Sequence, residues 1–369
     1  MGESSLRVLF LTLYPETIAS SRLRVYQYLP HLRQWGIEAT VLPALPEPWF
    51  SRVYFSSSKL THVIQYGAEV INTLRRLSAI GRYDVIFIQK GIVSTNLRGF
   101  DRLLEKVYDR VIFDLDDLIY GRSVVEFTQP FLRALQDPHQ TEIISSRSRA
   151  VVAGSSYLRD LALQHNRNVF LIPTPVDTDR FRPRRENSKP EKGEIVIGWI
   201  GIPGALVYLR AIENVLRDLS GRYPIRLKLI TRIPEKPFTL NGVKIKTVPW
   251  SYETEVQELE ELDIGIMPLP DSEWARGKCG LKLLQYMAMG IPSVSSRVGA
   301  NSEIVEEGRD GFLAQDPDEW AGKLSRLVED AQLRKKMGSE ARAKVLEKYS
   351  LGKMAPRLAG VLKGDGVGR

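Results

Sequence analysis

Apolar and polar positions follow two alternating patterns along all 369 residues of the chain. Short β-branched and aliphatic runs predict strands, and longer stretches with apolar residues three and four positions apart predict helices. This alternation is typical of doubly wound α/β domains built on parallel sheets. In the first half we expect strands at 7–12, 38–42, 85–89, 111–114, 150–153 and 169–172, and helices at 21–35, 58–80, 97–107 and 155–164.

A segment rich in proline and polar residues, 173–194, separates this series from a second one. We therefore expect an N-terminal domain at 1–180, a linker at 181–194 and a C-terminal domain at 195–349. A last helix at about 350–365 is expected to pack back on the first domain. The second series predicts strands at 195–200, 225–230, 243–248, 263–267 and 292–296, and helices at 205–218, 252–261, 280–289, 317–329 and 331–348.

The composition fits two ordinary globular domains, with 43% hydrophobic and 26% charged residues. Cys279 is the only cysteine, which excludes an intramolecular disulfide and a cysteine-based metal cluster and is compatible with a reducing compartment. The N-terminus shows no signal-peptide pattern, and no apolar run approaches the roughly 20 residues that span a bilayer. We therefore expect a cytoplasmic protein.

The formal net charge of +8 is unevenly distributed. Residues 1–185 hold 24 basic and 18 acidic residues, an excess that favours anionic partners, although a solvated basic face explains it equally well. The stretch Lys59–Ile80 adds apolar residues at helical spacing and ends near Arg75 and Arg76. This stretch fits either of two roles. It could make peripheral contact with the inner face of an anionic membrane, or it could pack in the core in the ordinary way.

One segment of the second series has the features of an anion site. The run Asp263–Pro270 reads as a buried strand, and a helix is expected from Leu281 until Gly290, with the turn-forming Gly277 and Gly280 before it. A helix N-terminus after such a loop favours phosphate through its free N–H groups and its dipole. Beside it we expect Lys278 and Lys282 to supply positive charge and Gln285 to hydrogen-bond a ribose hydroxyl.

This segment resembles the donor-site motif of the retaining GT-B glycosyltransferases of family 4, with a divergent pattern. The positions that match are Gly280, Leu281, Met287, Ala288, Gly290 and Pro292, and residues 299–313 resemble the family's next blocks. The resemblance implies two Rossmann-like domains facing each other across a cleft. It also implies transfer of a sugar from a nucleotide-diphosphate sugar, with retention of configuration and without a cofactor.

The departures from the family pattern concern charge. The two family glutamates fall on Gly277 and Gln285, and we expect Glu273 to replace the first. The family's cations after the first strand of the second domain are absent, so Arg276 is expected to join the two lysines at the diphosphate. The complete predicted donor site is Gly201, Glu273, Arg276, Lys278, Gly280, Leu281, Lys282 and Gln285.

In the first domain, Ser20 or Ser21 is a candidate helix N-cap, followed by Arg22 and Arg24 in the first turn. Arginine there opposes the helix dipole, which favours a functional role in binding phosphate or an acceptor anion. The predicted acceptor side is therefore Ser21, Arg22 and Arg24, and the alternative is an ordinary exposed arginine pair.

Three carboxylates, Asp114, Asp116 and Asp117, come at or just after the end of a predicted strand. Alternation along the strand places the first two on one side. The resemblance places a catalytic group near Asp116 or Asp117, and a carboxylate there can accept a bond from a sugar hydroxyl or stabilise an oxocarbenium-like centre. A divalent-metal site and a simple helix cap are the alternatives. We expect no metal, because the lysines can neutralise the diphosphate.

None of the four histidines, His31, His62, His139 and His165, follows a strand in a recognisable motif, so no histidine general base is predicted. We expect a glycosyltransferase with a nucleotide-sugar donor, an acceptor that is a glycan, a lipid-linked molecule or a small molecule, and no nucleic-acid partner. The alternatives are a sugar-nucleotide epimerase of the same fold and a catalytically weak sugar-nucleotide-binding protein.

Overall fold

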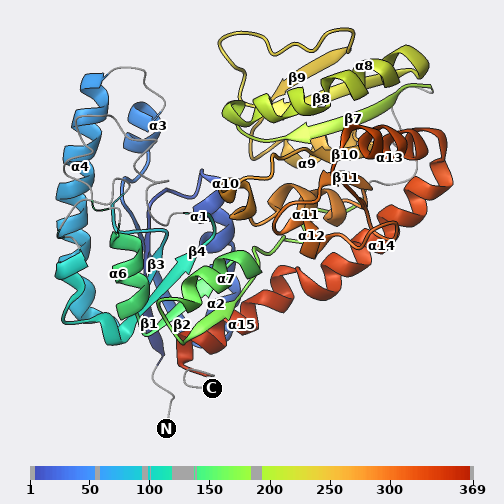
Figure 1. Ribbon diagram of the computed structural model, residues 1–369. Helices are drawn as coiled ribbons and strands as arrows, with labels where there is room; N and C mark the ends of the chain where they lie inside the picture. The colour runs from blue at the N-terminus through green and yellow to red at the C-terminus, as the bar shows by residue number, and fades with distance from the viewer. Residues whose placement is uncertain are drawn as a thin grey trace. The chain divides into compact units, whose positions relative to one another are not determined.

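The computed structural model describes residues 5–54, 59–93, 99, 101–118, 137, 139–183 and 193–365. The chain forms two compact units (Figure 1). Unit 1 comprises Met1–Pro175, Gly277–Cys279 and Leu351–Arg369, and unit 2 comprises Val176–Arg276 and Gly280–Ser350. The first break thus lies between Pro175 and Val176, ahead of the expected boundary at 180. Most of the expected linker, 184–192, lies outside the described residues.

Unit 1 contains a parallel six-stranded sheet with the order β2-β1-β3-β4-β5-β6. Its strands are β1 (Leu6–Thr12), β2 (Ile37–Pro43), β3 (Val85–Gln89), β4 (Val111–Leu115), β5 (Ala150–Ala153) and β6 (Val169–Leu171). Its helices are α1 (Ala19–Arg24), α2 (Leu29–Gln34), α3 (Trp49–Tyr54), α4 (Lys59–Ser78), α6 (Gln140–Arg147), α7 (Ser156–Leu163) and α15 (Leu351–Lys363).

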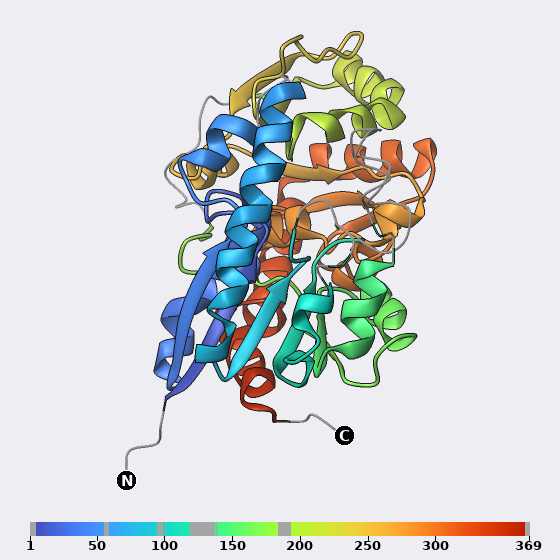
Figure 2. The same cartoon turned by 90° about the vertical axis from the view of Figure 1, so that its left-hand side faces the viewer.

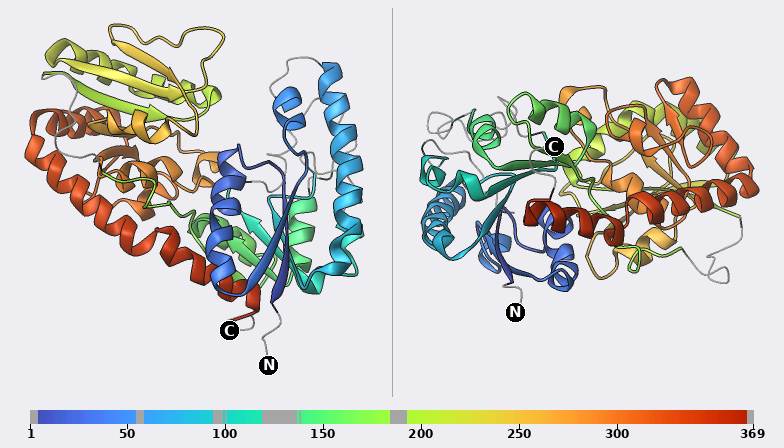
Figure 3. Two further views of the ribbon diagram at one scale, coloured as in Figure 1. Left: turned by 180° about the vertical axis from the view of Figure 1, so that it is seen from behind. Right: turned by 90° about the horizontal axis from the view of Figure 1, so that it is seen from below.

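Helices cover both faces of this sheet. Alternate strand residues such as Val8 and Phe10 pack against α2 and α15, while Leu9 and Leu11 face the second core, which includes α6 and α7. Figures 1 and 3 show α2 and α15 on one side of the sheet and α4 and α6 on the other. This two-sided burial explains why the strands read as continuous apolar runs.

Two helices of unit 1 differ from the prediction. The expected helix 21–35 is interrupted at Val25, where α1 ends, and α2 starts anew with Pro30 in its first turn. Proline is tolerated there because the first N–H groups of a helix have no intrahelical acceptor. Within the described part of the expected helix 97–107, residues 101–104 form a 3₁₀ turn instead.

Unit 2 contains a second parallel six-stranded sheet, ordered β12-β11-β10-β7-β8-β9. Its strands are β7 (Ile195–Ile200), β8 (Ile225–Thr231), β9 (Ile245–Pro249), β10 (Ile264–Met267), β11 (Ser293–Ser296) and β12 (Phe312–Ala314). Its helices are α8 (Glu213–Arg222), α9 (Glu255–Glu260), α10 (Glu273–Arg276), α11 (Leu281–Ala288), α12 (Asn301–Ile304), α13 (Pro317–Glu329) and α14 (Ala331–Lys348).

Both faces of the second sheet are also buried. One core contains residues of α8 and α13, and the other contains residues of α9, α11 and α14. The expected helix 205–218 is instead a 3₁₀ segment, Pro203–Ile212, that leads into α8. The predicted class, α/β with two doubly wound parallel sheets, is confirmed.

The register of unit 1 aligns polar residues at the carboxyl edge of the sheet. Thr12 pairs with Gln89, and Gln89 pairs with Asp114. Ligands of doubly wound sheets bind beyond this edge, so the residues that follow these positions are candidates for function. Among the described helices, none has the length and apolar content needed to cross a membrane.

Candidate functional site

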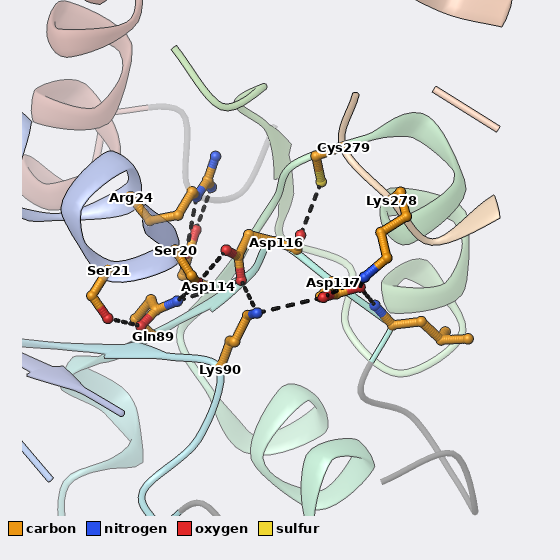
Figure 4. A network of polar contacts seen from close by, with 11 residues as sticks. Ser20, Ser21, Arg24, Gln89, Lys90, Asp114, Asp116, Asp117, Lys278 and Cys279 are labelled. Atoms are coloured by element: carbon orange, nitrogen blue, oxygen red, sulfur yellow. Dashed lines mark hydrogen bonds and ion pairs between the residues drawn. The ribbon is translucent and has the colours of Figure 1, made fainter. Parts of the chain in front are cut away.

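A polar network in unit 1 brings together residues from four parts of the chain (Figure 4). We call it the aspartate network, and its members are Ser20, Arg24, Gln89, Lys90, Asp114, Asp116, Asp117 and Lys278. They come from α1, from the end of β3, from β4 with the two residues beyond Leu115, and from the segment Gly277–Cys279.

Asp114 and Arg24 form a bidentate ion pair inside unit 1. Arg24 Nε donates to Asp114 Oδ2 at 3.1 Å, Arg24 Nη2 pairs with Asp114 Oδ1, and Arg24 Nη1 donates to the Ile172 carbonyl at 2.8 Å. Burial alone would lower the pKa of Arg24, but the charge and hydrogen bond of Asp114 raise it above its usual range. Both side chains are almost fully buried. The expected roles of Asp114 at the reacting face and of Arg24 with acceptor anions are therefore replaced by a structural role.

Asp116 contacts α1, as Asp114 does, and its side chain is only 8% exposed, compared with 25% for Asp117. It accepts a 2.6 Å bond from Ser20 Oγ and a longer one from Gln89 Nε2, and its Oδ1 lies 3.4 Å from Lys90 Nζ. Ser20 and Arg24, four residues apart, lie on one face of α1, and Asp114 and Asp116, two residues apart, lie on one side of the extended chain. The two pairs can therefore meet. Three donors thus surround the Asp116 side chain.

Asp117 lies between two lysines. Lys278 Nζ is 2.9 Å from both of its carboxylate oxygens, and Lys90 Nζ is 3.6 Å from Oδ2. Burial would raise the pKa of Asp117, but the charges of Lys90 and Lys278, with a backbone bond from Leu118, lower it below its ordinary value. Lys278 is thus bound by a carboxylate, a contact that was not predicted.

Close backbone approaches hold the segment Gly277–Cys279 on unit 1. A Cβ on Gly277 would lie 2.5 Å from that of Leu118, and one on Gly154 would lie 2.6 Å from Cys279 Sγ. The Cys279 thiol donates to the Asp116 carbonyl at 3.2 Å, and burial raises its pKa, so the thiol stays protonated. Cys279 is therefore a packing residue, not a nucleophile.

The three aspartates are all paired with cations: Asp114 with Arg24, and Asp116 and Asp117 with the shared Lys90, which Lys278 joins at Asp117. Within the described ranges, no group of three or more His, Cys, Asp or Glu side chains is arranged to hold a metal ion. Of the histidines, His31 lies in α2, His139 precedes α6 and His165 follows α7. The side chain of His62 lies outside the described residues.

Helix α1 differs from the expectation at its start. It begins at Ala19 after Ile18, which makes no side-chain cap, so neither Ser20 nor Ser21 is the N-cap. Ser21 is buried and donates to Gln89 Oε1 at 2.9 Å. Arg22 and Arg24 lie in the last turn of this six-residue helix, where positive charge suits the dipole. The argument that these arginines oppose local preference is therefore wrong.

In unit 2, the predicted donor helix α11 begins where expected. Gly280 is its N-cap with a φ of +68°, and a Cβ there would lie 2.2 Å from Ile304 Cδ1. Leu281 is the first helical residue and is half-buried. Lys282 Nζ lies 4.4 Å from the centroid of the Trp199 ring, and Gly201 leaves room for both side chains. Only glycine fits at Gly280 without strain.

Gln285 is buried and donates from Nε2 to Glu255 Oε1 at 2.9 Å. The same oxygen accepts from Trp250 Nε1, and Glu255 Oε2 lies 3.5 Å from Arg180 Nη2. Arg180 stacks on the ring of Tyr252, with its guanidinium carbon 3.7 Å from the centroid. The family pattern has a glutamate at the position of Gln285. In this chain the carboxylate of Glu255 lies next to that position instead.

The two remaining predicted donor residues lie on α10. Arg276 forms a two-point ion pair with Asp271, at 2.7 and 3.0 Å, and both side chains are at least half exposed. Glu273 is exposed at the first position of the helix. The guanidinium expected at the diphosphate is thus paired with the Asp271 carboxylate.

Lys90 and Glu255 were missed by the sequence analysis. Among the described residues, Lys90 is the only one other than glycine that has a positive φ, +65°. Such strain is commonly retained where function requires it. Its signal was a lysine directly after the buried run Val85–Gln89. Glu255 had no comparable signal, because its partner Gln285 lies 30 residues away.

Part of the second unit matches a known protein family. Residues 196–330 match the family described as "Glycosyl transferases group 1". The sulfoquinovosyl transferase SQD2 of Arabidopsis thaliana is 29% identical over 197 residues, which are 47% of this chain and 36% of that protein. A D-inositol 3-phosphate glycosyltransferase of Corynebacterium jeikeium is 26% identical over 55% of this chain and 54% of its own length. The chain therefore spans about a third to a half of these relatives.

Solved structures resemble the whole chain. The Anabaena protein Alr3699/HepE, crystallised with UDP-glucose, has a TM-score of 0.68 at 14% identity, covering 97% of this chain and 100% of its own. Sucrose-phosphate synthase of Thermosynechococcus elongatus has a TM-score of 0.69 at 14% identity, covering 97% and 98%. At this identity the likeness establishes the fold, and the resemblance noted in the sequence is confirmed at that level.

Proposed function

We propose that this chain, which is similar to the GT-B glycosyltransferases in its family match and in its fold, transfers a sugar from a nucleotide-diphosphate sugar to an acceptor. One observation carries the proposal: the family match, residues 196–330, contains the whole predicted donor helix with Gly280 at its N-terminus. The curated relatives are named as sugar transferases, and a structural neighbour was crystallised with UDP-glucose.

For the donor we propose that the diphosphate lies at the N-terminus of α11, where backbone N–H groups and the helix dipole favour anions. Gly280 and Leu281 would approach it through the backbone, and Lys278 and Lys282 would supply charge. The ribose would be met by Gln285 together with Glu255, whose carboxylate is 2.9 Å from the Gln285 amide. Arg276 and Glu273 have the weakest support, since Arg276 is paired with Asp271.

For the reacting face we propose Asp116 and Asp117, each of which forms an ion pair with a lysine. Asp116 would accept a bond from a sugar hydroxyl as positive charge develops at the anomeric carbon. Metal-independent transfer is proposed because the carboxylates already carry ammonium partners and the lysines can neutralise phosphate. Retention is proposed from the family resemblance, with the leaving phosphate as the acceptor's base.

The acceptor class that we propose is a glycan or a lipid-linked molecule. A lipid-linked acceptor would be met at a membrane surface, and α4 is the element of unit 1 whose side chains suit such contact. The second candidate function is a sugar-nucleotide-binding protein with weak catalysis. The absence of the family's glutamates, at Gly277 and Gln285, favours it.

The test is a panel of nucleotide sugars, scored first by thermal shift and then by transfer of a radiolabelled sugar to candidate glycans and lipid extracts. Bound donor raises the melting temperature because it stabilises the folded state. Labelled product dependent on an acceptor supports transfer, and its anomeric configuration decides retention. A shift without product supports the binding protein. No shift with any nucleotide sugar contradicts both candidates.

A further inference from the structure

Helix α4 of unit 1 buries polar side chains and exposes aliphatic ones, which is the reverse of an ordinary surface helix. Its polar residues Gln65, Glu69, Thr73 and Arg76 are buried, and they lie on one face because they are spaced four, four and three apart. The large aliphatic residues on the opposite face are between 49% and 70% exposed, and we call them the α4 stripe: Leu60, Val63, Ile64, Ile71 and Leu74.

Polar contacts fix this orientation. Arg76 donates to the carbonyls of Thr12, Leu42 and Ile92, at 3.2, 3.1 and 2.5 Å, and Asn72 donates to the carbonyls of Pro43 and Ala44. Burial lowers the pKa of Arg76 to about 10, which leaves it charged at neutral pH. Turning the helix to bury the stripe would break all these bonds. The fold of unit 1 therefore keeps the α4 stripe exposed.

The exposed charge on α4 itself is basic. Glu69 is the only acidic residue in Lys59–Ser78, and it is buried. Arg75 is exposed on the outward face, and the exposed Arg82 and Arg52 lie just after α4 and on the neighbouring α3. Figure 2 shows α3 beside α4, viewed from the side of the unit on which α4 lies. Within α4 a second copy would offer Arg75 no exposed carboxylate, because Glu69 is buried, whereas an anionic lipid surface would offer phosphates.

We propose that α4 docks unit 1 on an anionic lipid bilayer. The stripe extends from Leu60 to Leu74, 14 steps along the helix or about 21 Å at 1.5 Å per residue. Aliphatic side chains on one helix face with cations beside them match a helix lying in the headgroup region. Soluble monomers rarely expose such a contiguous apolar surface. The proposal concerns the location of the protein and does not depend on sugar transfer.

The test is co-sedimentation of the full chain with phosphatidylcholine vesicles that contain or lack phosphatidylglycerol, at low salt. We expect binding only to the anionic vesicles and weaker binding as salt is added. The double variant Ile64→Glu/Ile71→Glu should lose about tenfold or more of the partition coefficient, because two inserting side chains become charged. The matched control is Leu346→Glu on α14, since Leu346 is a 44% exposed leucine elsewhere; it should bind as wild type.

Folding of each variant is checked by circular dichroism, and Arg75→Glu provides a second variant that leaves the stripe intact. It should weaken binding to anionic vesicles alone. The proposal is overturned if the wild-type protein binds neither vesicle type, or if the double variant co-sediments with anionic vesicles as the wild type does. It is also overturned if light scattering shows a wild-type dimer that the double variant dissociates, because the stripe is then a self-association surface.

Discussion

Lys278 and Asp117, 161 residues apart, form a two-point contact in which the ammonium nitrogen is 2.9 Å from each carboxylate oxygen. Lys278 is two residues before Gly280, which begins the predicted donor helix. A donor diphosphate that used Lys278 would have to compete with Asp117 for it.

This competition predicts opposite effects of two substitutions on nucleotide-diphosphate affinity. Lys278→Ala should raise the Kd about tenfold by removing a charge-assisted bond to phosphate. Asp117→Asn should lower the Kd severalfold by releasing the lysine. Isothermal titration with UDP and GDP measures both, and Asp84→Asn, in the exposed pair with Arg7, is the control. Unchanged Kd values for both variants would remove Lys278 from the donor site.

Acid should weaken unit 1 through Asp117. Its pKa is lowered by Lys90 and Lys278 against the effect of burial. A carboxyl group with a lowered pKa contributes stability that is complete above its unfolded pKa, about 3.9, and is lost as the pH falls through the folded value. The melting temperature of wild type should therefore drop more steeply below about pH 4 than that of Asp117→Asn. Parallel curves would show that the two lysines do not stabilise the ionised carboxylate.

The buried Arg24–Asp114 pair should be a large contributor to stability. Arg24→Ala leaves an uncompensated buried carboxylate, which costs about 3–5 kcal/mol of unfolding free energy. Urea unfolding measures the loss, and Arg7→Ala, which opens the exposed pair with Asp84, should leave the transition unchanged. A loss for Arg24→Ala as small as for Arg7→Ala would contradict the structural role.

The sequence was a good guide to the sheets because buried parallel strands are continuous apolar runs, as in Val85–Gln89. It was a poor guide to the helix 21–35, because apolar spacing does not reveal that Pro30 begins a new helix. Periodicity located the apolar positions of α4 but not which face is buried. That choice depends on the reach of Arg76 to three carbonyls from other elements.

The candidate site was predictable in position but not in its contacts. A strand end followed by Asp116 and Asp117 points to the carboxyl edge of a sheet from the sequence alone. Their partners Ser20 and Lys278 are 96 and 161 residues away, so only the tertiary fold pairs them. The positive φ of Lys90 is likewise a property of the folded backbone.

The carbonyls that Arg76 binds should make it more important to folding than its neighbour. Arg76→Ala removes charged hydrogen bonds inside unit 1 and should cost about 3 kcal/mol. The adjacent Arg75 is exposed, and Arg75→Ala should stay within about 0.5 kcal/mol of wild type. Urea unfolding of both variants measures the difference. Equal losses would mean that α4 does not depend on the buried guanidinium.

Gly280 should be required both for its backbone angle and for the space beside it. Gly280→Ala forces a side chain to a φ of +68° and towards Ile304, so it should cost more than the 1 kcal/mol or so of a left-handed alanine. Gly308 has a φ of +77° with nothing within 4 Å, and Gly308→Ala therefore isolates the cost of the angle. Because Gly280 fixes the start of α11, its substitution should also weaken nucleotide binding about tenfold, whereas Gly308→Ala should not. Thermal melting and isothermal titration of both variants test this, and equal behaviour of the two alanines would show that contact with Ile304 does not set the position of the helix.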